Sequence, residues 1–243
     1  MNTKFMKACF GLTIVLLLVS ACGILPTLGS RHMITENRNV SGFDRVDVNG
    51  GGDVTIIQDG TESLAIQTDD NVMQYVTSEV RGGTLYIGLQ FPNLRSVIPS
   101  RLSLTLHVKD LSGINTSGAW DVASESIQAG NLDIAISGSG KVNISMLKAD
   151  KLNIDISGSG DMIMAGNVKT QDLSISGSGT YQAGDLQTQD TKVSVSGSGN
   201  VTVWASVNLN ASVGGNGTIN YYGSPQVSFD QSGSGKIKSL GSK

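Results

Sequence analysis

The phrase Ile136-Ser-Gly-Ser-Gly140 recurs as Ile156-Ser-Gly-Ser-Gly160, Ile175-Ser-Gly-Ser-Gly179 and Val195-Ser-Gly-Ser-Gly199. Looser copies stand at Val213-Gly-Gly-Asn-Gly217 and Gln231-Ser-Gly-Ser-Gly235. The first serines are residues 137, 157, 176, 196 and 232, with Gly214 in the corresponding place between the last two, so the steps are 20, 19, 20, 18 and 18 residues. A fixed period near 20 residues is typical of a protein built from stacked repeats.

Apolar residues alternate on both sides of each Ser-Gly-Ser-Gly phrase, as in Leu132-x-Ile134-x-Ile136 before it and Val142-x-Ile144 after it. Alternate residues of a strand point to the same face, so each strand lays one apolar row inward. A single unit cannot bury that row, whereas units stacked in register bury it against their neighbours. A coil of this length holds two strands of roughly 17 Å each, with turns and room for a short third strand. The pattern predicts an all-β protein, a parallel β-solenoid (β-helix) with coils of about 20 residues.

The Ser-Gly-Ser-Gly phrases are interpreted as the corners of these coils. Glycine permits a positive φ where the chain turns, and serine hydroxyls can bond to freed backbone groups or to the serine one coil away. This interpretation makes the corners structural; a row facing a ligand is the alternative. The structural corner residues are Gly138, Gly140, Gly158, Gly160, Gly177, Gly179, Gly197, Gly199, Gly233 and Gly235.

A single solenoid domain is predicted over residues 38–243, with regular repeats at 111–243 and less regular coils at 38–110. Asn49-Gly-Gly-Gly52 lies between alternating apolar residues and resembles a degenerate corner. The segment from Val72 to Val76 is expected to form a short helical turn. Residues 91–101, which include two prolines, are expected to form a loop.

The first 21 residues have the pattern of a secretory signal: Lys4 and Lys7, then an apolar run, then small residues. The run ends in Leu18-Val19-Ser20-Ala21-Cys22, which resembles a bacterial lipobox. We therefore expect residues 1–21 to be a lipoprotein signal peptide, Cys22 to carry the lipid, and residues 22–37 to form a tether. An ordinary signal peptide cut nearby is the alternative. The expected location is the bacterial cell envelope, with the membrane as partner through the lipid.

Several function classes lack support in the sequence. The net charge of −3 provides no basic field for nucleic acid. Gly138-Ser-Gly-Lys141 fails as a phosphate-binding loop, because Ala135 and Val142 stand where glycine and Ser or Thr are required. The residue after each corner varies and His32 and His107 are the only histidines, so no metal or other cofactor is expected.

Enzyme activity is not expected either, because Asp133, Asp155, Asp172 and Asp190 do not recur at one phase of the repeat. Trp120, Trp204 and Tyr221-Tyr222 are interpreted as packing or capping residues, with sugar stacking as the alternative. Exposed strand edges at the solenoid ends and on its flat faces make a homo-oligomer plausible, and Lys236, Lys238 and Lys243 would blunt one end.

The order Phe43-Asp-Arg-Val-Asp-Val-Asn-Gly-Gly-Gly-Asp-Val54, Asp69-Asp-Asn-Val72, Gly83-Thr-Leu85 and the repeated corners resembles the bacterial auto-transporter adhesin family with a head GIN domain. The resemblance covers roughly residues 38–238 and implies a β-helical envelope protein, often a lipoprotein, without catalytic residues. The expected function is that of a non-enzymatic adhesin binding a protein or glycan at the surface. A periplasmic scaffold or signalling accessory, and a polysaccharide-active enzyme, are the alternatives.

Overall fold

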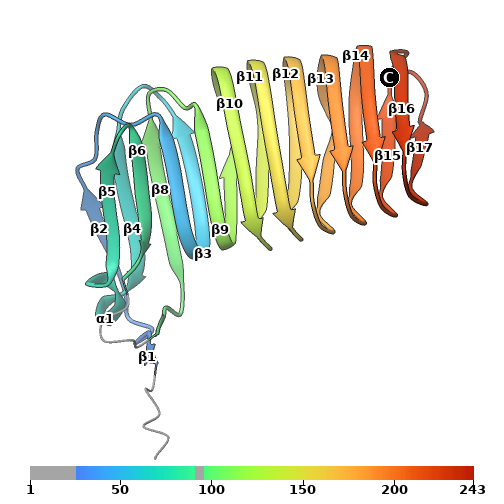
Figure 1. Ribbon diagram of the computed structural model, residues 1–243. Helices are drawn as coiled ribbons and strands as arrows, with labels where there is room; N and C mark the ends of the chain where they lie inside the picture. The colour runs from blue at the N-terminus through green and yellow to red at the C-terminus, as the bar shows by residue number, and fades with distance from the viewer. Residues whose placement is uncertain (1–25, 91–95) are drawn as a thin grey trace, which may run out of the picture.

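The protein is a parallel β-solenoid of about six turns, as the sequence predicted, with 71% of the described residues in strands and 2% in helix. The computed structural model describes residues 26–90 and 96–243. Figure 1 shows a row of regular coils that extends from a less regular N-terminal block. The lipobox and Cys22 lie outside the described residues.

Long strands stacked in parallel form the regular coils. In register, Ile134 lies beside Ile154, which lies beside Leu173, and the apolar row is buried as predicted. The strands are β9 (Gly113–Ser124), β10 (Ile127–Gly138), β11 (Lys141–Gly158), β12 (Asp161–Ile175), β13 (Thr180–Val195) and β14 (Asn200–Val213).

Each coil has two long faces and one short face between them. The pairing of β11 with β12 shifts in register between Ile144 and Leu147, and the pairing of β11 with both neighbours is interrupted again at Asp150. Residues 147–149 therefore form a short segment between the two longer paired segments of β11. We call the surface formed by residues 127–129, 147–149, 166–168 and 186–188 the narrow face. The arrowheads of β10–β14, which end at the Ser-Gly-Ser-Gly corners, all point to the opposite side of the molecule (Figure 1).

The N-terminal block continues the stack for one more coil. Strand β3 (Arg45–Gln58) pairs in parallel with β9 over twelve residues, and Gly50 lies beside Gly118. The degenerate corner at residues 49–52 therefore stacks directly on residues 117–120, which form the corner of β9. Trp120 fills the space between these two coils and is fully buried.

Beyond β3 the pairing becomes mostly antiparallel. Strand β8 (Leu102–Val108) pairs with β4 (Ser63–Asp69), which pairs with β2 (Met33–Arg38), and β6 (Thr84–Leu89) pairs with β5 (Val76–Arg81). The helical turn expected at residues 72–76 is α1 (Asp70–Met73), which begins two residues earlier, and Val76 already belongs to β5.

The N-terminal segment is more ordered than the tether expected at residues 22–37. Strand β1 (Thr27–Leu28) pairs with β7 (Val97–Ile98), within the stretch expected to be a loop, and β2 is part of the main sheet. Backbone pairing to distant segments, which leaves no periodic signal in so short a stretch, accounts for the difference.

A final coil is formed by β15 (Thr218–Tyr222) and β16 (Gln226–Gln231), and β17 (Lys236–Ser239) begins the layer beyond it. Strand β16 stacks on β14, and β17 stacks on β15. Phe229 and Ile237 are only partly buried because no further coil covers them among the described residues.

Candidate ligand-binding surface

The corner glycines allow the coils to approach closely. A Cβ on Gly177 would lie 2.1 Å from the carbonyl oxygen of Gly158, and one on Gly197 would lie 2.2 Å from that of Gly177. Of the ten predicted corner glycines, only Gly138 and Gly158 have a positive φ, at 146° and 137°. Close backbone approach, rather than the predicted dihedral angle, is therefore the requirement that these corners share.

Serine hydroxyls contribute less to the corners than expected. The Oγ atoms of Ser137 and Ser157 lie 3.3 Å apart, and the remaining corner contacts are mainly backbone hydrogen bonds, such as Ser178 N–H to the Gly158 carbonyl at 2.9 Å. The edge of the solenoid formed by the Ser-Gly-Ser-Gly corners thus carries one hydroxyl–hydroxyl contact, and its other contacts are mainly between backbone groups.

The titratable groups are dispersed. His107 Nδ1 lies 2.7 Å from Asp59 Oδ2, and His32 Nδ1 lies 3.1 Å from Asp70 Oδ2, on separate segments. Hydrogen bonds from Thr61, and then from His107, lower the pKa of Asp59 to about 2. Within residues 26–90 and 96–243, no group of three or more His, Cys, Asp or Glu side chains is arranged to hold a metal ion.

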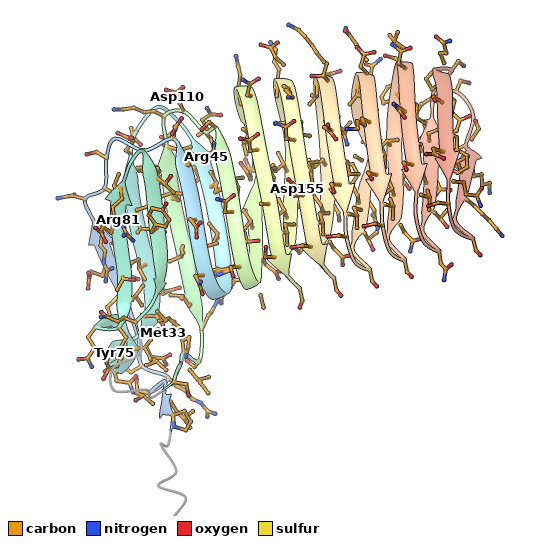
Figure 2. All side chains as sticks on the ribbon, in the orientation of Figure 1. Met33, Arg45, Tyr75, Arg81, Asp110 and Asp155 are labelled. Carbon is orange, nitrogen blue, oxygen red and sulfur yellow. The ribbon has the colours of Figure 1, made fainter. Side chains whose placement is uncertain are left out.

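The four aspartates considered for catalysis do not form a carboxylate pair. Asp133 and Asp172 stand on one ladder, but Asn153 lies between them, and its Nδ2 donates to Asp133 Oδ1 at 2.7 Å. Arg45 pairs with Asp133 at 3.3 Å, and Lys192 pairs with Asp172 at 3.5 Å. Asp155 and Asp190 lie on two other ladders. Asp133 and Asp172 are thus neutralised by different cations, and Figure 2 shows Arg45 and Asp155 on this long face.

The narrow face presents polar side chains with hydrogen-bonding capacity. Gln128, Lys148, Asn167 and Gln187 stand side by side on consecutive coils, and all four are exposed. Coils in a parallel sheet are about 4.8 Å apart, so donors and acceptors repeat at that spacing. This row was not predicted from the sequence, although each member stands nine residues before the first serine of a corner.

A groove follows the narrow face. One part, of about 390 Å³, extends from Gln128 past Lys148 and Asn167 to Ser206. A second part, of about 520 Å³, shares Gln128 and Asp150 with it and reaches Asp110, which Figure 2 places at the edge opposite α1. Lys169 Nζ lies 2.6 Å from Asp150 Oδ1, so the groove contains an ion pair beside Lys148 and the uncharged amides.

The tryptophans and the Tyr221-Tyr222 pair divide between packing and exposure. Trp120 is fully buried, as the packing interpretation predicted. Trp204 and Tyr222 are half-buried and lie in register on adjacent strands, at the end of the ladder that contains Gln187. A row of amides therefore leads to an aromatic pair.

A cluster of hydrogen bonds fastens the N-terminal segment to the block. The buried Asp69 carboxylate accepts from the backbone N–H of Arg31 at 2.6 Å, from the Ser100 N–H at 2.7 Å and from the Ser100 hydroxyl at 2.6 Å. Burial alone would raise the pKa of Asp69, but these hydrogen bonds outweigh it and hold that pKa below its ordinary value. Asn71 Nδ2 donates to the Leu28 carbonyl at 2.8 Å. We call Asp69, Asn71 and Ser100 the clasp.

Comparison with known proteins identifies relatives of the same fold. Residues 42–225 match the family described as "Putative auto-transporter adhesin, head GIN domain". The comparison with curated proteins gave no match. In the described residues, no helix is long and apolar enough to cross a membrane.

Solved structures agree with that match. The crystal structure of a putative adhesin from Bacteroides fragilis has a TM-score of 0.83 at 30% identity, covering 88% of this chain and 99% of that one. A putative adhesin from Parabacteroides distasonis has a TM-score of 0.73 at 27% identity, with 88% and 99% covered. A putative lipid binding protein from the same species shares the fold, with a TM-score of 0.76 at 23% identity and the same coverage. The chain belongs to the head GIN domain family, described as "Putative auto-transporter adhesin, head GIN domain".

Proposed function

We propose that this protein is a non-enzymatic, lipid-anchored adhesin of the bacterial cell envelope that binds an extended glycan or protein ligand along its narrow face. The observation that carries the proposal is the repeated row of Gln128, Lys148, Asn167 and Gln187 above a continuous groove. The row contains three uncharged amides and one cation. Such a row suits a polar polymer better than a compact charged metabolite. The family match supports the adhesin class.

The direction of the N-terminal segment supports display of this face. Strand β1 and helix α1 lie on the side to which the arrowheads of β10–β14 point, whereas the narrow face is on the opposite side (Figure 1). An anchor attached near β1 would therefore leave the groove pointing away from the membrane.

The proposed anchor gives the body a short reach. Thr27, the first residue of β1, is five residues after Cys22, a distance that an extended chain spans in at most about 18 Å. The clasp fixes residues 28–31, so no long flexible tether follows. Metabolic labelling with a fatty acid tests this: wild type is expected to be labelled and to partition with membranes, and Cys22→Ala to lose both properties. An unlabelled wild type would refute the anchor.

Binding is tested with the mature protein on whole cells, matrix proteins and glycan arrays. The variant Gln128→Ala/Asn167→Ala/Gln187→Ala removes three members of the row from exposed positions. The variant Ser137→Ala/Ser157→Ala alters the corner edge and is the matched control. We expect at least one ligand whose binding falls about tenfold or more in the triple variant and is unchanged in the control. Equal binding by wild type and both variants would exclude the narrow face as the binding surface.

Two experiments address the alternative functions. Protease treatment of intact cells should degrade a displayed adhesin, whereas full protection would favour a periplasmic scaffold or signalling accessory. A screen for glycan cleavage should give no products, whereas turnover abolished by a point substitution would establish an enzyme.

A further inference from the structure

The narrow face ends in an aromatic site that the amide row does not explain. Trp204 and Tyr222 lie side by side in register, and β13 bulges opposite them, because its register shifts between Ala183 and Gln187. Gly184, within the bulge, keeps the space beside the rings open: a Cβ there would lie 3.1 Å from Cε2 of Tyr222. We call the space bordered by the Trp204 ring, the Tyr222 ring and the Gly184 backbone the recess.

The recess contains an ammonium group from the same chain. Nζ of Lys243 lies 5.4 Å from the centroid of the Trp204 ring and 5.1 Å from that of Tyr222. The same Nζ donates to the Gly184 carbonyl and to the Asp185 carboxylate. Only 32% of the Lys243 side chain is exposed, whereas lysine is normally among the most exposed residues. Two ring faces, a carbonyl and a carboxylate are the groups that stabilise an alkylammonium ion.

Backbone contacts bring Lys243 to the recess. After β17, Leu240 N–H donates to the Tyr221 carbonyl at 2.8 Å, and the Gly241 carbonyl accepts from Gly223 N–H at 2.9 Å. Gly241 has a φ of 93°, which turns the chain back toward the rings. Residues 240–243 thus form a strap held by two hydrogen bonds.

We propose that Trp204, Tyr222, Asp185 and the Gly184 carbonyl form a binding site for alkylammonium groups, specifically the lysine side chain of a partner polypeptide, and that Lys243 occupies it in the free protein. The site carries a lysine in this structure, so its size and polarity fit that side chain. Because a short strap gives its own lysine a high effective concentration, an external lysine must compete with it. The proposal does not depend on whether the amide row binds a ligand.

The experiment uses tryptophan fluorescence of the mature chain, since the other tryptophan, Trp120, is fully buried. Nα-acetyl-L-lysine methylamide is the probe, and Lys243→Ala empties the recess. We expect the probe to cause a saturable change in the tryptophan emission of Lys243→Ala, with a Kd in the millimolar range. The Kd of wild type for the same probe should be about tenfold higher, because Lys243 competes for the site. Adding Asp185→Asn to Lys243→Ala should weaken binding severalfold. Thermal melting should show that these surface variants fold as wild type does.

Two further probes test the chemical class of the ligand. Nα-acetyl-norleucine methylamide retains the apolar stem without the ammonium group, and N-acetylglucosamine tests sugar stacking. We expect neither compound to bind Lys243→Ala, even at ten times the concentration at which the lysine probe binds it. Equal binding of either probe, or no binding of the lysine probe by Lys243→Ala, would overturn it.

Discussion

The stacking contacts within the regular coils differ from those at the junction between the coils and the N-terminal block. In the coils, neighbouring corners meet backbone to backbone, because glycine leaves no side chain between Gly158 and Gly177. At the junction between β3 of the block and β9, the backbones also meet, since a Cβ on Gly118 would lie 2.0 Å from the carbonyl oxygen of Gly50. A large side chain is added there: Trp120 of β9 lies in register with Gly52 and is fully buried. The repeats therefore depend on side chains that are absent, and the junction depends in addition on a particular side chain that is present.

From this difference we predict that the junction between β3 and β9 is most sensitive to the loss of Trp120. Trp120→Ala removes a fully buried indole, and we expect a loss of about 3–5 kcal/mol in the free energy of unfolding, measured with urea. Trp120→Phe should cost much less, since Nε1 of Trp120 has no hydrogen-bond partner to lose. A small effect of Trp120→Ala would mean that the block is not held at this point.

The clasp should come next in size. Asp69→Asn replaces a buried carboxylate that accepts three hydrogen bonds and should cost about 1–3 kcal/mol. Because the folded protein lowers the pKa of Asp69, its contribution is full above the ordinary value of about 3.9 and is lost as the pH falls through the lower folded value. The stability difference between wild type and Asp69→Asn should therefore be constant above about pH 5 and shrink below about pH 4. A difference that grows in acid would contradict the ionised clasp.

Within the coils, Tyr181 is an exception to backbone stacking, and its loss should have a moderate effect. Gln171 Nε2 donates to the Tyr181 hydroxyl at 3.0 Å, and both side chains are buried. Tyr181→Phe should cost about 1–2 kcal/mol near pH 7, because it leaves the Gln171 amide unpaired. Burial raises the pKa of Tyr181, so the unfolded state ionises first. Wild type should lose stability relative to Tyr181→Phe above about pH 10, as chemical denaturation in alkaline buffers would show.

The smallest effect on stability is expected at the groove that follows the narrow face. Lys169 and Asp150 are paired at 2.6 Å, but their side chains are 66% and 63% exposed. Lys169→Ala should change the free energy of unfolding by less than about 0.5 kcal/mol, since exposed ion pairs contribute little. A larger loss in thermal or urea unfolding would show that this face is a structural element rather than a free surface.

The same contrast explains what the sequence could predict. The 20-residue period and the alternating apolar residues were sufficient for the solenoid, and Asn49-Gly-Gly-Gly52 was sufficient to place the degenerate corner in the stack. Antiparallel pairing of β2 with β4 was not predictable, because it joins residues more than 25 positions apart without a repeat. The clasp was missed for the same reason, as Asp69 reaches Arg31 and Ser100. Cys22 remains a prediction.

The candidate surface was missed for a different reason. Gln128, Lys148, Asn167 and Gln187 differ in type, so a search for identical residues passes over them although their offset from the corners is constant. The ammonium site was also hidden, because it needs the bulge at Gly184 and the folded strap to bring Lys243 to Trp204 and Tyr222.

The most direct test of the central claim compares alanine at three glycines of the repeats. A Cβ on Gly158 or on Gly177 would lie 2.4 Å or less from a carbonyl oxygen of the preceding coil, yet only Gly158 has a positive φ; a Cβ on Gly130 would have no atom within 4 Å. Urea unfolding should give losses of about 3 kcal/mol or more for both Gly158→Ala and Gly177→Ala, similar to each other, and a negligible change for Gly130→Ala. If Gly177→Ala proved as harmless as Gly130→Ala while Gly158→Ala alone destabilised, the corners would depend on backbone angle, and the account based on close approach would be contradicted.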